Sequence, residues 1–349
     1  MLENNTRTEL SALGEFGLIK HLTEHIELKN PSTIKGVGDD AAVINYTNTN
    51  TVTLVSSDML VEGVHFDLTY VPLKHLGYKS VIVNLSDIYA MNGQPKQIVV
   101  SMAISSRFSL EAVEELYAGM LLACQKYGVD LVGGDTTSSL SGLVINITVL
   151  GECEKDKVVY RHGAKEGNLL CVSGDLGGAY MGLQILEREK TIFKENPNIQ
   201  PDLEGKDYIL ERQLKPEARK DIVKLFSDLN LQPRSMMDVS DGLASEILHI
   251  CTQSNVGCEL YEEKIPIDSQ TYDTARQFNL DATVCALSGG EDYELLFTID
   301  AADYDKVKNL PDFSVIGHIT NKEKGTNLVT KSGTVAALKA QGWDALLKK

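Results

Sequence analysis

The sequence predicts two domains built from α/β and α+β layers. Its 349 residues exceed the length of one average domain, and a prior of roughly 150 residues per domain gives about two. Runs of β-branched residues occur both in succession and between helical segments, which favours mixed layers over a helical bundle. A polar, glycine-containing stretch at 160–167 precedes a new apolar strand. We therefore expect one domain in residues 1–155 and a second in residues 156–349.

The expected strands are short runs rich in β-branched and apolar residues. They lie at Val52–Val55, Gln97–Ile104, Leu143–Leu150, Leu169–Val172 and Tyr293–Ile299. The stretch Glu187–Lys206 is polar and contains two prolines, Pro197 and Pro201. We expect this stretch to form a surface loop, because proline and polar residues disfavour buried regular structure.

Helical periodicity is clearest in Leu110–Tyr127, where Ser109 is the expected N-cap. A second helix is expected at Pro216–Leu229, with proline at its first position. A third helix is expected from about Asp241 to Ile250, and residues 76–91 also fit a helix.

Composition restricts the class of protein. Asp and Glu outnumber Lys and Arg by 49 to 33, and the net charge of −16 argues against a nucleic-acid partner, which requires clustered cations. Six cysteines occur without a C-x-x-C pair, which indicates a reducing compartment. The sequence shows neither a signal peptide nor an apolar run long enough to span a membrane. We expect a cytoplasmic protein without a membrane partner.

One phrase recurs along the chain: a strand-like run, one or two small residues, and then an acid. It is found in GVGDDAAVI at 36–44, VSSDML at 55–60, VNLSDIYAM at 83–91, VGGDTTSS at 132–139, VSGDLGGA at 172–179, MMDVSDGLA at 236–244 and LSGGEDYELLF at 287–297. A single aspartate after a strand often caps the next helix. Seven such acids in apolar surroundings, with few cations nearby, are poorly explained by caps alone.

Clustered carboxylates repel one another, by about 4 kcal/mol for a pair 4 Å apart at an effective dielectric constant near 20. Hard divalent cations remove this repulsion and prefer oxygen ligands. The neighbouring glycines allow a phosphate to approach the backbone closely. The pattern therefore predicts metal-bridged phosphate binding.

Other phosphate-binding motifs are absent or weak. The Walker motif is missing, because Gly205 and Lys206 are followed by Asp207. The segment 36–41 fits a relaxed dinucleotide pattern, but two acids stand where a pyrophosphate would bind. The protein-kinase motifs H-R-D and D-F-G do not occur.

Eight segments in this order resemble the thiamine-monophosphate kinase family. They are GEFGLIKHL at 14–22, GVGDDAAVI, SSDMLVEGVHF at 56–66, VNLSDIYAMNGQP at 83–95, GGDT at 133–136, SGDLGGA, DVSDGLASE and LSGGEDYELLF, and GWDAL at 342–346 closes the match. The resemblance implies the fold shared with aminoimidazole ribonucleotide synthetase. In that fold an N-terminal α/β domain pairs in a homodimer, and ATP with several Mg²⁺ ions lies between this domain and a C-terminal α+β domain. The implied reaction is direct transfer of a phosphoryl group from ATP to thiamine monophosphate.

The resemblance also implies roles for individual residues. It implies metal binding by Asp39, Asp40, Ser56, Ser57, Asp58, Asp87, Asp135, Asp238 and Asp241, with Asp87, Asp135 and Asp238 at the catalytic centre. It implies ATP binding by Tyr117, Gly134, Asp135, Arg161 and Ser240. Substrate binding is implied for His65, Glu291 and Trp343. Independently of the resemblance, Asp241 is expected at a helix start, where free backbone amides favour phosphate.

Several of these residues have simpler explanations. Trp343 could anchor the C-terminal tail, His65 could be a structural histidine, and Tyr117 could only pack on its amphipathic helix. Arg161 could pair with a local acid. Tyr89 and Asn92 replace smaller residues of the family pattern, and neither change removes an expected ligand.

Rival functions remain from the same superfamily and from outside it. A selenophosphate synthetase would carry a reactive cysteine near its N-terminus, whereas Cys124 is the first cysteine here and lies in an expected helix. An amidine cyclase is disfavoured by the VEGVHF, SGGEDYELLF and GWD segments. A non-catalytic metal- or nucleotide-binding module would explain the acids but not the candidate substrate residues.

Overall fold

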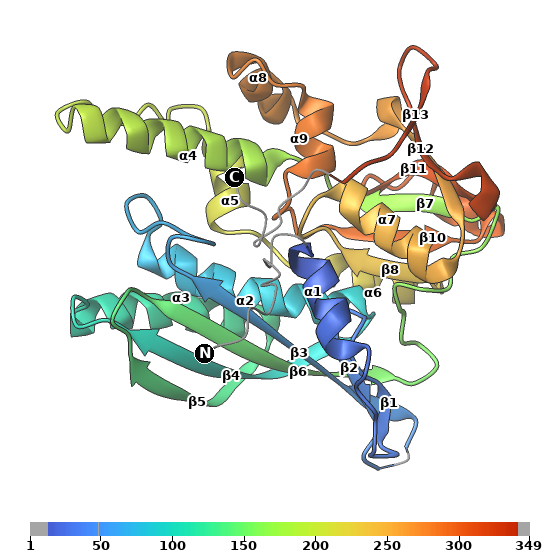
Figure 1. Cartoon of the computed structure of the whole chain (residues 1–349), viewed down its shortest axis with the longest axis horizontal. Coiled ribbons are helices and arrows are strands. Elements are labelled where there is room, and N and C mark those ends of the chain that lie inside the picture. Colours follow the sequence, from blue (N-terminus) through green and yellow to red (C-terminus); the bar gives the residue numbers. More distant parts are fainter. Residues whose placement is uncertain (1–12, 48, 341–349) are drawn as a thin grey trace, which may run out of the picture.

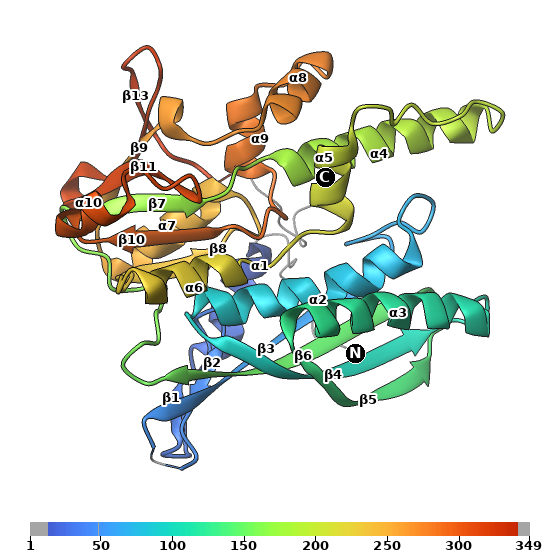
Figure 2. The same cartoon turned by 180° about the vertical axis from the view of Figure 1, so that it is seen from behind.

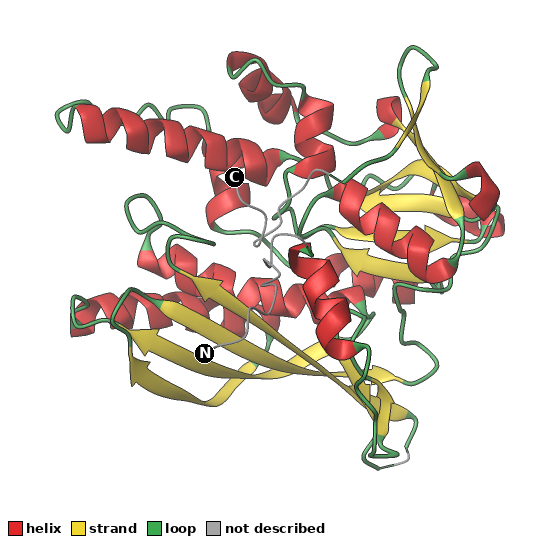
Figure 3. Ribbon diagram, viewed as in Figure 1, coloured by secondary structure: helices red, strands yellow, loops and turns green. Residues whose placement is uncertain are grey.

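The computed structural model describes residues 13–47 and 49–340. These residues form two β-sheets, and helices pack against each of them (Figures 1 and 3). Each half of the chain contributes one sheet, and the two sheets share no strand. Residues 155–168 connect the last strand of the first sheet to the first strand of the second. The predicted α/β and α+β class is therefore confirmed.

The first sheet has six strands in the order β1-β2-β3-β6-β4-β5. Their bounds are β1 Thr33–Lys35, β2 Ala42–Ile44, β3 Thr51–Val61, β4 Gln94–Ile104, β5 Asp130–Ser138 and β6 Val144–Glu154. β3 and β6 pair antiparallel along their whole length, and β4 pairs parallel with the edge strand β5. Residues alternate between a buried face and a partly open face, as a half-covered sheet requires.

Two helices, α2 (Leu73–Ala90) and α3 (Leu110–Tyr127), cover the buried face of this sheet (Figure 2). They pack closely because glycines stand where they cross. A Cβ on Gly77 would lie 1.9 Å from the Leu116 carbonyl oxygen, and a Cβ on Gly119 would lie 1.9 Å from that of Lys74. α2 also contacts the second sheet, so it is buried on nearly all sides. Residues on α2 can therefore reach both halves of the molecule.

The second sheet has seven strands in the order β13-β12-β9-β11-β7-β10-β8, mostly antiparallel. Their bounds are β7 Leu169–Ser173, β8 Ser235–Asp238, β9 Gly257–Tyr261, β10 Leu295–Ile299, β11 Phe313–Thr320, β12 Thr326–Val329 and β13 Val335–Ala337. The remaining described α-helices are α1 Gly14–Thr23, α4 Gly178–Glu195, α5 Asp207–Leu214, α6 Lys220–Asp228, α7 Leu243–Ser254, α8 Ser269–Gln277, α9 Ala282–Ser288 and α10 Tyr304–Val307. None of the helices in the described ranges is long and apolar enough to cross a membrane.

One hydrophobic core joins the two halves. Phe226 of α6 packs against Phe297 of β10 with ring centroids 4.9 Å apart, and Phe297 packs against Phe313 of β11 at 5.3 Å. These rings belong to the same buried cluster as Ile82 and Leu85 of α2. The apolar contact positions the end of β8 above α2, which is where the candidate site lies.

The expected strands all overlap observed ones, and the helix at 110–127 has the predicted bounds with Ser109 as its cap. The helix expected from Pro216 begins only at Lys220. The Glu217 carboxylate accepts hydrogen bonds from Tyr78 and Tyr127, which hold this segment against the first domain before the helix starts.

The polar stretch expected as a loop at 187–206 is partly helical, because α4 continues to Glu195. Buried Met181, Ile185 and Leu186 form an apolar face on α4, and Glu189 is also buried. An amphipathic stripe outweighs the polar composition here. The loop is confined to residues 196–206.

Candidate active site

Three carboxylates from three elements meet where α2 faces β8. Asp87 is in the last turn of α2, Asp40 immediately precedes β2, and Asp238 ends β8. One oxygen of each lies within 4.8 Å of the others. We call these residues the three-carboxylate cluster. The cluster is made by both halves of the chain, so its geometry depends on how the halves pack.

Hydroxyl groups hold two of these carboxylates in place. Ser56 donates a hydrogen bond of 2.5 Å to Asp87, and Ser86 donates one of 2.6 Å to Asp238. Ser56 and Asp58 are two residues apart on β3 and therefore face α2 together.

The cluster carries more negative charge than nearby cations balance. Burial raises the pKa of Asp87 well above its usual value, and the charges of Asp58 and Asp238 raise it further. Burial likewise raises the pKa of Asp238 to about 7, with the charge of Asp40 adding to the effect. Asp40 is 6% exposed, and its Oδ2 atom has no hydrogen-bond partner. Buried oxygens of this kind fit a hard divalent cation such as Mg²⁺.

Arg161 is the cation that contacts this cluster. Its guanidinium donates to Asp40 at 2.5 and 3.1 Å, and its backbone amide donates to Asp39 at 2.7 Å. Lys35 pairs with Asp39 at 3.1 Å. The contacts of Arg161 agree with the simpler explanation that it pairs with a local acid. Its expected role in nucleotide binding stays a prediction.

The loop between β8 and α7 is organised by Glu246, which the sequence reasoning missed. The backbone amides of Ser240 and Asp241 both donate to its Oε1 atom, at 3.2 and 2.8 Å. Burial raises the pKa of Glu246 well above its usual value. Glu246 therefore occupies the two amides that precede α7, and phosphate binding by the amides of the first turn of α7 stays a prediction. Glu246 follows Asp241 by five residues, and this short spacing could have indicated the contact.

The GGEDY segment adopts a strained backbone. Glu291 and Tyr293 have φ values of 58° and 51°, a region that residues with side chains rarely adopt. The Glu291 amide donates to the Ser240 carbonyl oxygen at 2.7 Å, and the Tyr293 amide donates to that of Val239 at 2.9 Å. This pairing with the β8–α7 loop fixes Glu291 beside α2, where Lys79 contacts it at 2.9 Å. Such strain is often found at functional sites.

Two expected metal ligands lie on the other face of the first sheet. Ser57 contacts Thr148 and Asn146 on the open face, opposite to Ser56 and Asp58. Only the backbone of Ser57 can serve the three-carboxylate cluster. Asp135 pairs in register with Ser101, which pairs with Asn146, so its exposed side chain is also on the open face.

Tyr117 and Gly134 have their described contacts within the first domain. Tyr117 is half-buried on α3 and packs against the first core. Gly134 lies where a Cβ would be 1.9 Å from the Val100 carbonyl oxygen, so strand pairing alone requires a glycine there. Trp343 is outside the described residues. The roles implied for these three residues stay predictions.

Comparison with known proteins agrees with this geometry. The models for the AIR synthase related protein, N-terminal domain and C-terminal domain, match residues 38–153 and 165–329. Thiamine-monophosphate kinase of Bacillus subtilis (strain 168) is 34% identical over 95% of this chain and 99% of its own length. The chain belongs to the thiamine-monophosphate kinase family. The family member of Buchnera aphidicola subsp. Acyrthosiphon pisum is 35% identical over 90% of this chain and 93% of its own. The solved structure of AaThiL complexed with AMPPCP and TMP has a TM-score of 0.81 and 31% identity, and covers 97% of this chain and 99% of its own.

One family motif has a structural role that the sequence reasoning did not predict. In SGDLGGA, Asp175 accepts from Tyr208 and contacts Arg212 through its carbonyl oxygen. The amide of Gly177 is bonded at 2.8 Å to the buried Asp292 carboxylate. We call Asp175, Asp292, Glu294, Arg212 and Arg219 the arginine-paired cluster. Tyr208 occupies the Asp175 Oδ2 atom and Asp292 occupies the Gly177 amide, while the Asp175 Oδ1 atom is buried without a hydrogen-bond partner.

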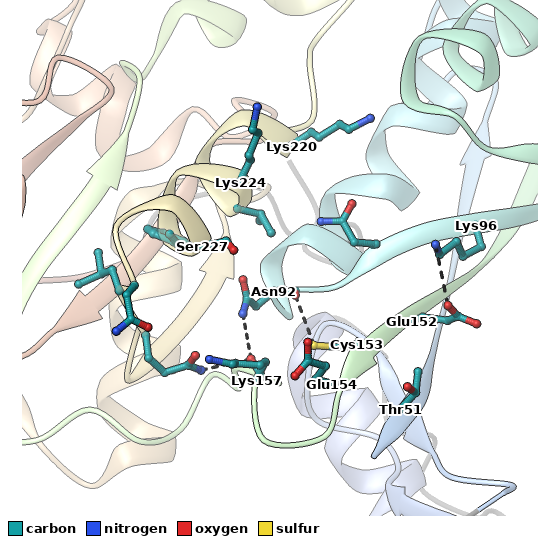
Figure 4. A pocket seen from close by; sticks show the side chains of 16 residues that line it. Thr51, Asn92, Lys96, Glu152, Cys153, Glu154, Lys157, Lys220, Lys224 and Ser227 are labelled. Carbon is teal, nitrogen blue, oxygen red and sulfur yellow. Dashed lines mark hydrogen bonds and ion pairs between the residues drawn. The ribbon is translucent and has the colours of Figure 1, made fainter. Parts of the chain in front are cut away.

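A cavity of about 640 Å³ lies apart from the three-carboxylate cluster and shares no lining residue with it. Its wall has lysines of both domains and two glutamates of the first domain, Glu152 and Glu154 (Figure 4). Lys96 is 3.9 Å from Glu152, and Lys220 and Lys224 extend from α6 in different directions. Because the charges are mixed and do not converge, the cavity contributes nothing to the assignment of the site.

Proposed function

We propose that this chain transfers the γ-phosphoryl group of ATP directly to thiamine monophosphate, giving thiamine diphosphate and ADP. A phosphate oxygen of thiamine monophosphate forms a bond to the γ-phosphorus, and the bond to the β,γ-bridging oxygen breaks, so that ADP leaves with the electron pair. Family membership supports this reaction, as does the likeness to AaThiL complexed with AMPPCP, an ATP analogue, and TMP. The three-carboxylate cluster is the observation that carries the proposal.

We assign several Mg²⁺ ions to this site, and the three carboxylates could hold one of them. When bound, they would neutralise the phosphate oxygens of ATP and of the acceptor. We assign the ligands to Asp40, Asp58, Asp87 and Asp238, with contributions from residues implied by the family motifs: Asp39, Ser56, the Ser57 backbone and Asp241. The family motif also implies metal binding by Asp135, whose side chain lies on the open face of the sheet and not at the three-carboxylate cluster. The orphaned Oδ2 atom of Asp40 supports this assignment, because a buried charged oxygen without a partner is costly.

The protein's own groups would act chiefly by positioning. Ser56 and Ser86 hold the carboxylates of Asp87 and Asp238 in fixed orientations. Arg161 offsets part of the negative charge through Asp40, and with Tyr117, Gly134 and Ser240 it is assigned to the nucleotide. His65, Glu291 and Trp343 are assigned to the acceptor. Phosphoryl transfer requires little covalent help, and an acceptor phosphate ionised near neutral pH needs no general base.

We further assign a homodimer to this chain, formed through the open face of the first sheet. Met59 of β3 lies on this face and is more than half exposed, as is Val132 of β5. Ser57 and Asp135 also lie on this face. We assign residues 1–155 and 156–349 to the two domains and the protein to the cytoplasm, where its six free cysteines would stay reduced.

The test is to incubate the purified protein with ATP, Mg²⁺ and thiamine monophosphate and to separate the products as fluorescent thiochrome derivatives. We expect thiamine diphosphate and ADP in equal amounts, and neither in the presence of a chelator. ADP formed without thiamine diphosphate would contradict the assigned acceptor. Product formed at the same rate with chelator present would contradict the role of the metal.

A further inference from the structure

A small hollow between α2, α5 and the segment after β3 borders the candidate acceptor site. His65, Lys79 and Gln213 supply its polar atoms, and Leu76 and Leu214 supply apolar wall. Its volume is about 10 Å³, roughly the space that one water-sized group requires. An amino group fits this hollow, whereas a whole ring does not.

Lys79 is buried beneath this hollow and holds Glu291. The lysine is 5% exposed, and its ammonium group contacts a Glu291 oxygen at 2.9 Å and donates to the Gln213 carbonyl oxygen at 3.1 Å. A buried lysine must be paired, so this contact fixes both side chains. The Glu291 side chain is 28% exposed, which leaves it reachable from the open side.

Gln213 has an unused acceptor. Its Nε2 atom donates to the second Glu291 oxygen at 2.8 Å, and this contact fixes the orientation of the amide. The Oε1 atom is buried without a hydrogen-bond partner in a residue that is 5% exposed. An orphaned buried carbonyl oxygen is costly unless a ligand supplies a donor.

His65 offers a donor in the same place. Its Nδ1 atom accepts a hydrogen bond of 3.0 Å from the Val61 amide, so the hydrogen of the neutral ring is on Nε2. His65 lines the same hollow as Lys79 and Gln213, and both of these residues contact Glu291. Two hydrogen-bond acceptors, the Gln213 Oε1 atom and the Glu291 carboxylate, therefore lie near one donor, the Nε2–H group of His65.

We propose that Gln213 is a specificity residue that, with Glu291, accepts hydrogen bonds from the exocyclic amino group of the acceptor's pyrimidine ring. The His65 N–H donates to the adjacent ring nitrogen, which is the complementary pattern of an aminopyrimidine. Lys79 is a positioning residue that acts through Glu291. This inference rests on the proposed function, because it specifies how that same site recognises thiamine monophosphate.

The test compares thiamine monophosphate with its analogue in which hydrogen replaces the exocyclic amino group. The variant is Gln213→Met, which keeps side-chain length and removes the amide, and Gln277→Met on the exposed end of α8 is the matched control. We expect Gln213→Met to lower kcat/KM for thiamine monophosphate about 10-fold, mainly through KM. Turnover of the analogue and KM for ATP should change less than about twofold.

Lys79→Met should raise KM for thiamine monophosphate in the same way, and Lys79→Arg should restore most of the loss. Equal losses on both acceptors in Gln213→Met, or a wild-type protein that does not discriminate between them, would overturn the inference. Thermal unfolding of each variant separates a folding defect from a lost contact. If the wild-type protein forms no thiamine diphosphate at all, the proposed function fails first and the inference falls with it.

Discussion

The three-carboxylate cluster and the arginine-paired cluster both gather buried acids from family motifs, but they differ in how many cations neutralise these acids. Two arginines contact the acids of the arginine-paired cluster, whereas Arg161 alone is seen to contact the three-carboxylate cluster among the described residues. In the arginine-paired cluster, Glu294 is bonded to Arg212 at 2.8 Å and also to Arg219. In the three-carboxylate cluster, the neighbours of Asp87 are a serine and other acids.

The two clusters differ in the neighbouring charges that act on the pKa of a buried acid. Burial is the largest cause of the raised pKa of Asp292, about 7, and of Asp238, also about 7. The next cause for Asp292 is Arg212, which lowers the pKa, whereas for Asp238 it is the charge of Asp40, which raises it. A buried acid with a fixed arginine stabilises the fold, and a buried acid beside other acids is suited to a metal ion. The partner side chains, more than the local motif, decide the role.

The largest expected effect is on catalysis in the three-carboxylate cluster. Asp87→Asn should lower kcat on the order of 10³-fold, because it removes a charge from the centre of the expected metal site. The same change should raise the unfolding free energy in chelator by about 1 kcal/mol, since like charges no longer repel. Thiochrome chromatography and chemical denaturation measure the two effects. Asp273→Asn, on the exposed face of α8, should change neither.

In the arginine-paired cluster the main effect should be on stability. Arg212→Met should lower the unfolding free energy by about 3 kcal/mol, because Glu294 and Asp292 lose a buried partner. Urea denaturation with and without Mg²⁺ measures it. A loss that Mg²⁺ reverses would show that this cluster also binds metal and would remove the distinction between the two regions.

Mg²⁺ should stabilise the folded protein by binding at the three-carboxylate cluster and not at the arginine-paired cluster. At 100 times its dissociation constant, the ion should add about 2.7 kcal/mol to the unfolding free energy. Differential scanning calorimetry should show this gain in the wild-type protein and in Arg212→Met. The gain should be absent from Asp87→Asn, and its persistence there would place the metal elsewhere.

The last expected effect is a pH dependence of stability in chelator. The pKa of Asp238 is about 7 when folded, above its ordinary value of 3.8, so between these values the folded state binds the extra proton. Stability should therefore fall as pH rises from about 4 to 7, by about 1 kcal/mol per pH unit for this group. Asp238→Asn should flatten the slope measured by urea titrations at successive pH values. An unchanged slope would mean that Asp238 does not titrate in this range.

Sequence reasoning predicted the elements and the acids well because each depends on local pattern. The strands follow β-branched runs, and Ser109 caps α3 as expected. Only the family resemblance predicted that Asp40, Asp87 and Asp238 lie close together in the folded chain. No local pattern shows that the end of β8 packs onto α2 through Phe226 and Phe297.

Some contacts could not be predicted because their partners lie in another part of the sequence. Asp292 accepts a hydrogen bond from the Gly177 amide before α4, and no pattern near Gly177 indicates this partner. Glu246, by contrast, is five residues from Asp241 in the same DVSDGLASE segment, so its contact with the Asp241 amide is local. The opposite facing of Ser56 and Ser57 follows from strand alternation and could have been predicted once β3 was placed.

The most direct test of the account is a crystal structure of the protein with Mn²⁺, a non-hydrolysable ATP analogue and thiamine monophosphate. Anomalous scattering locates Mn²⁺, which takes oxygen ligands as Mg²⁺ does. We expect anomalous peaks bonded to Asp40, Asp87 and Asp238, between the phosphates of the two ligands. Peaks only at Asp175 and the glycines before α4, or none near Asp87, would contradict the assignment of the three-carboxylate cluster.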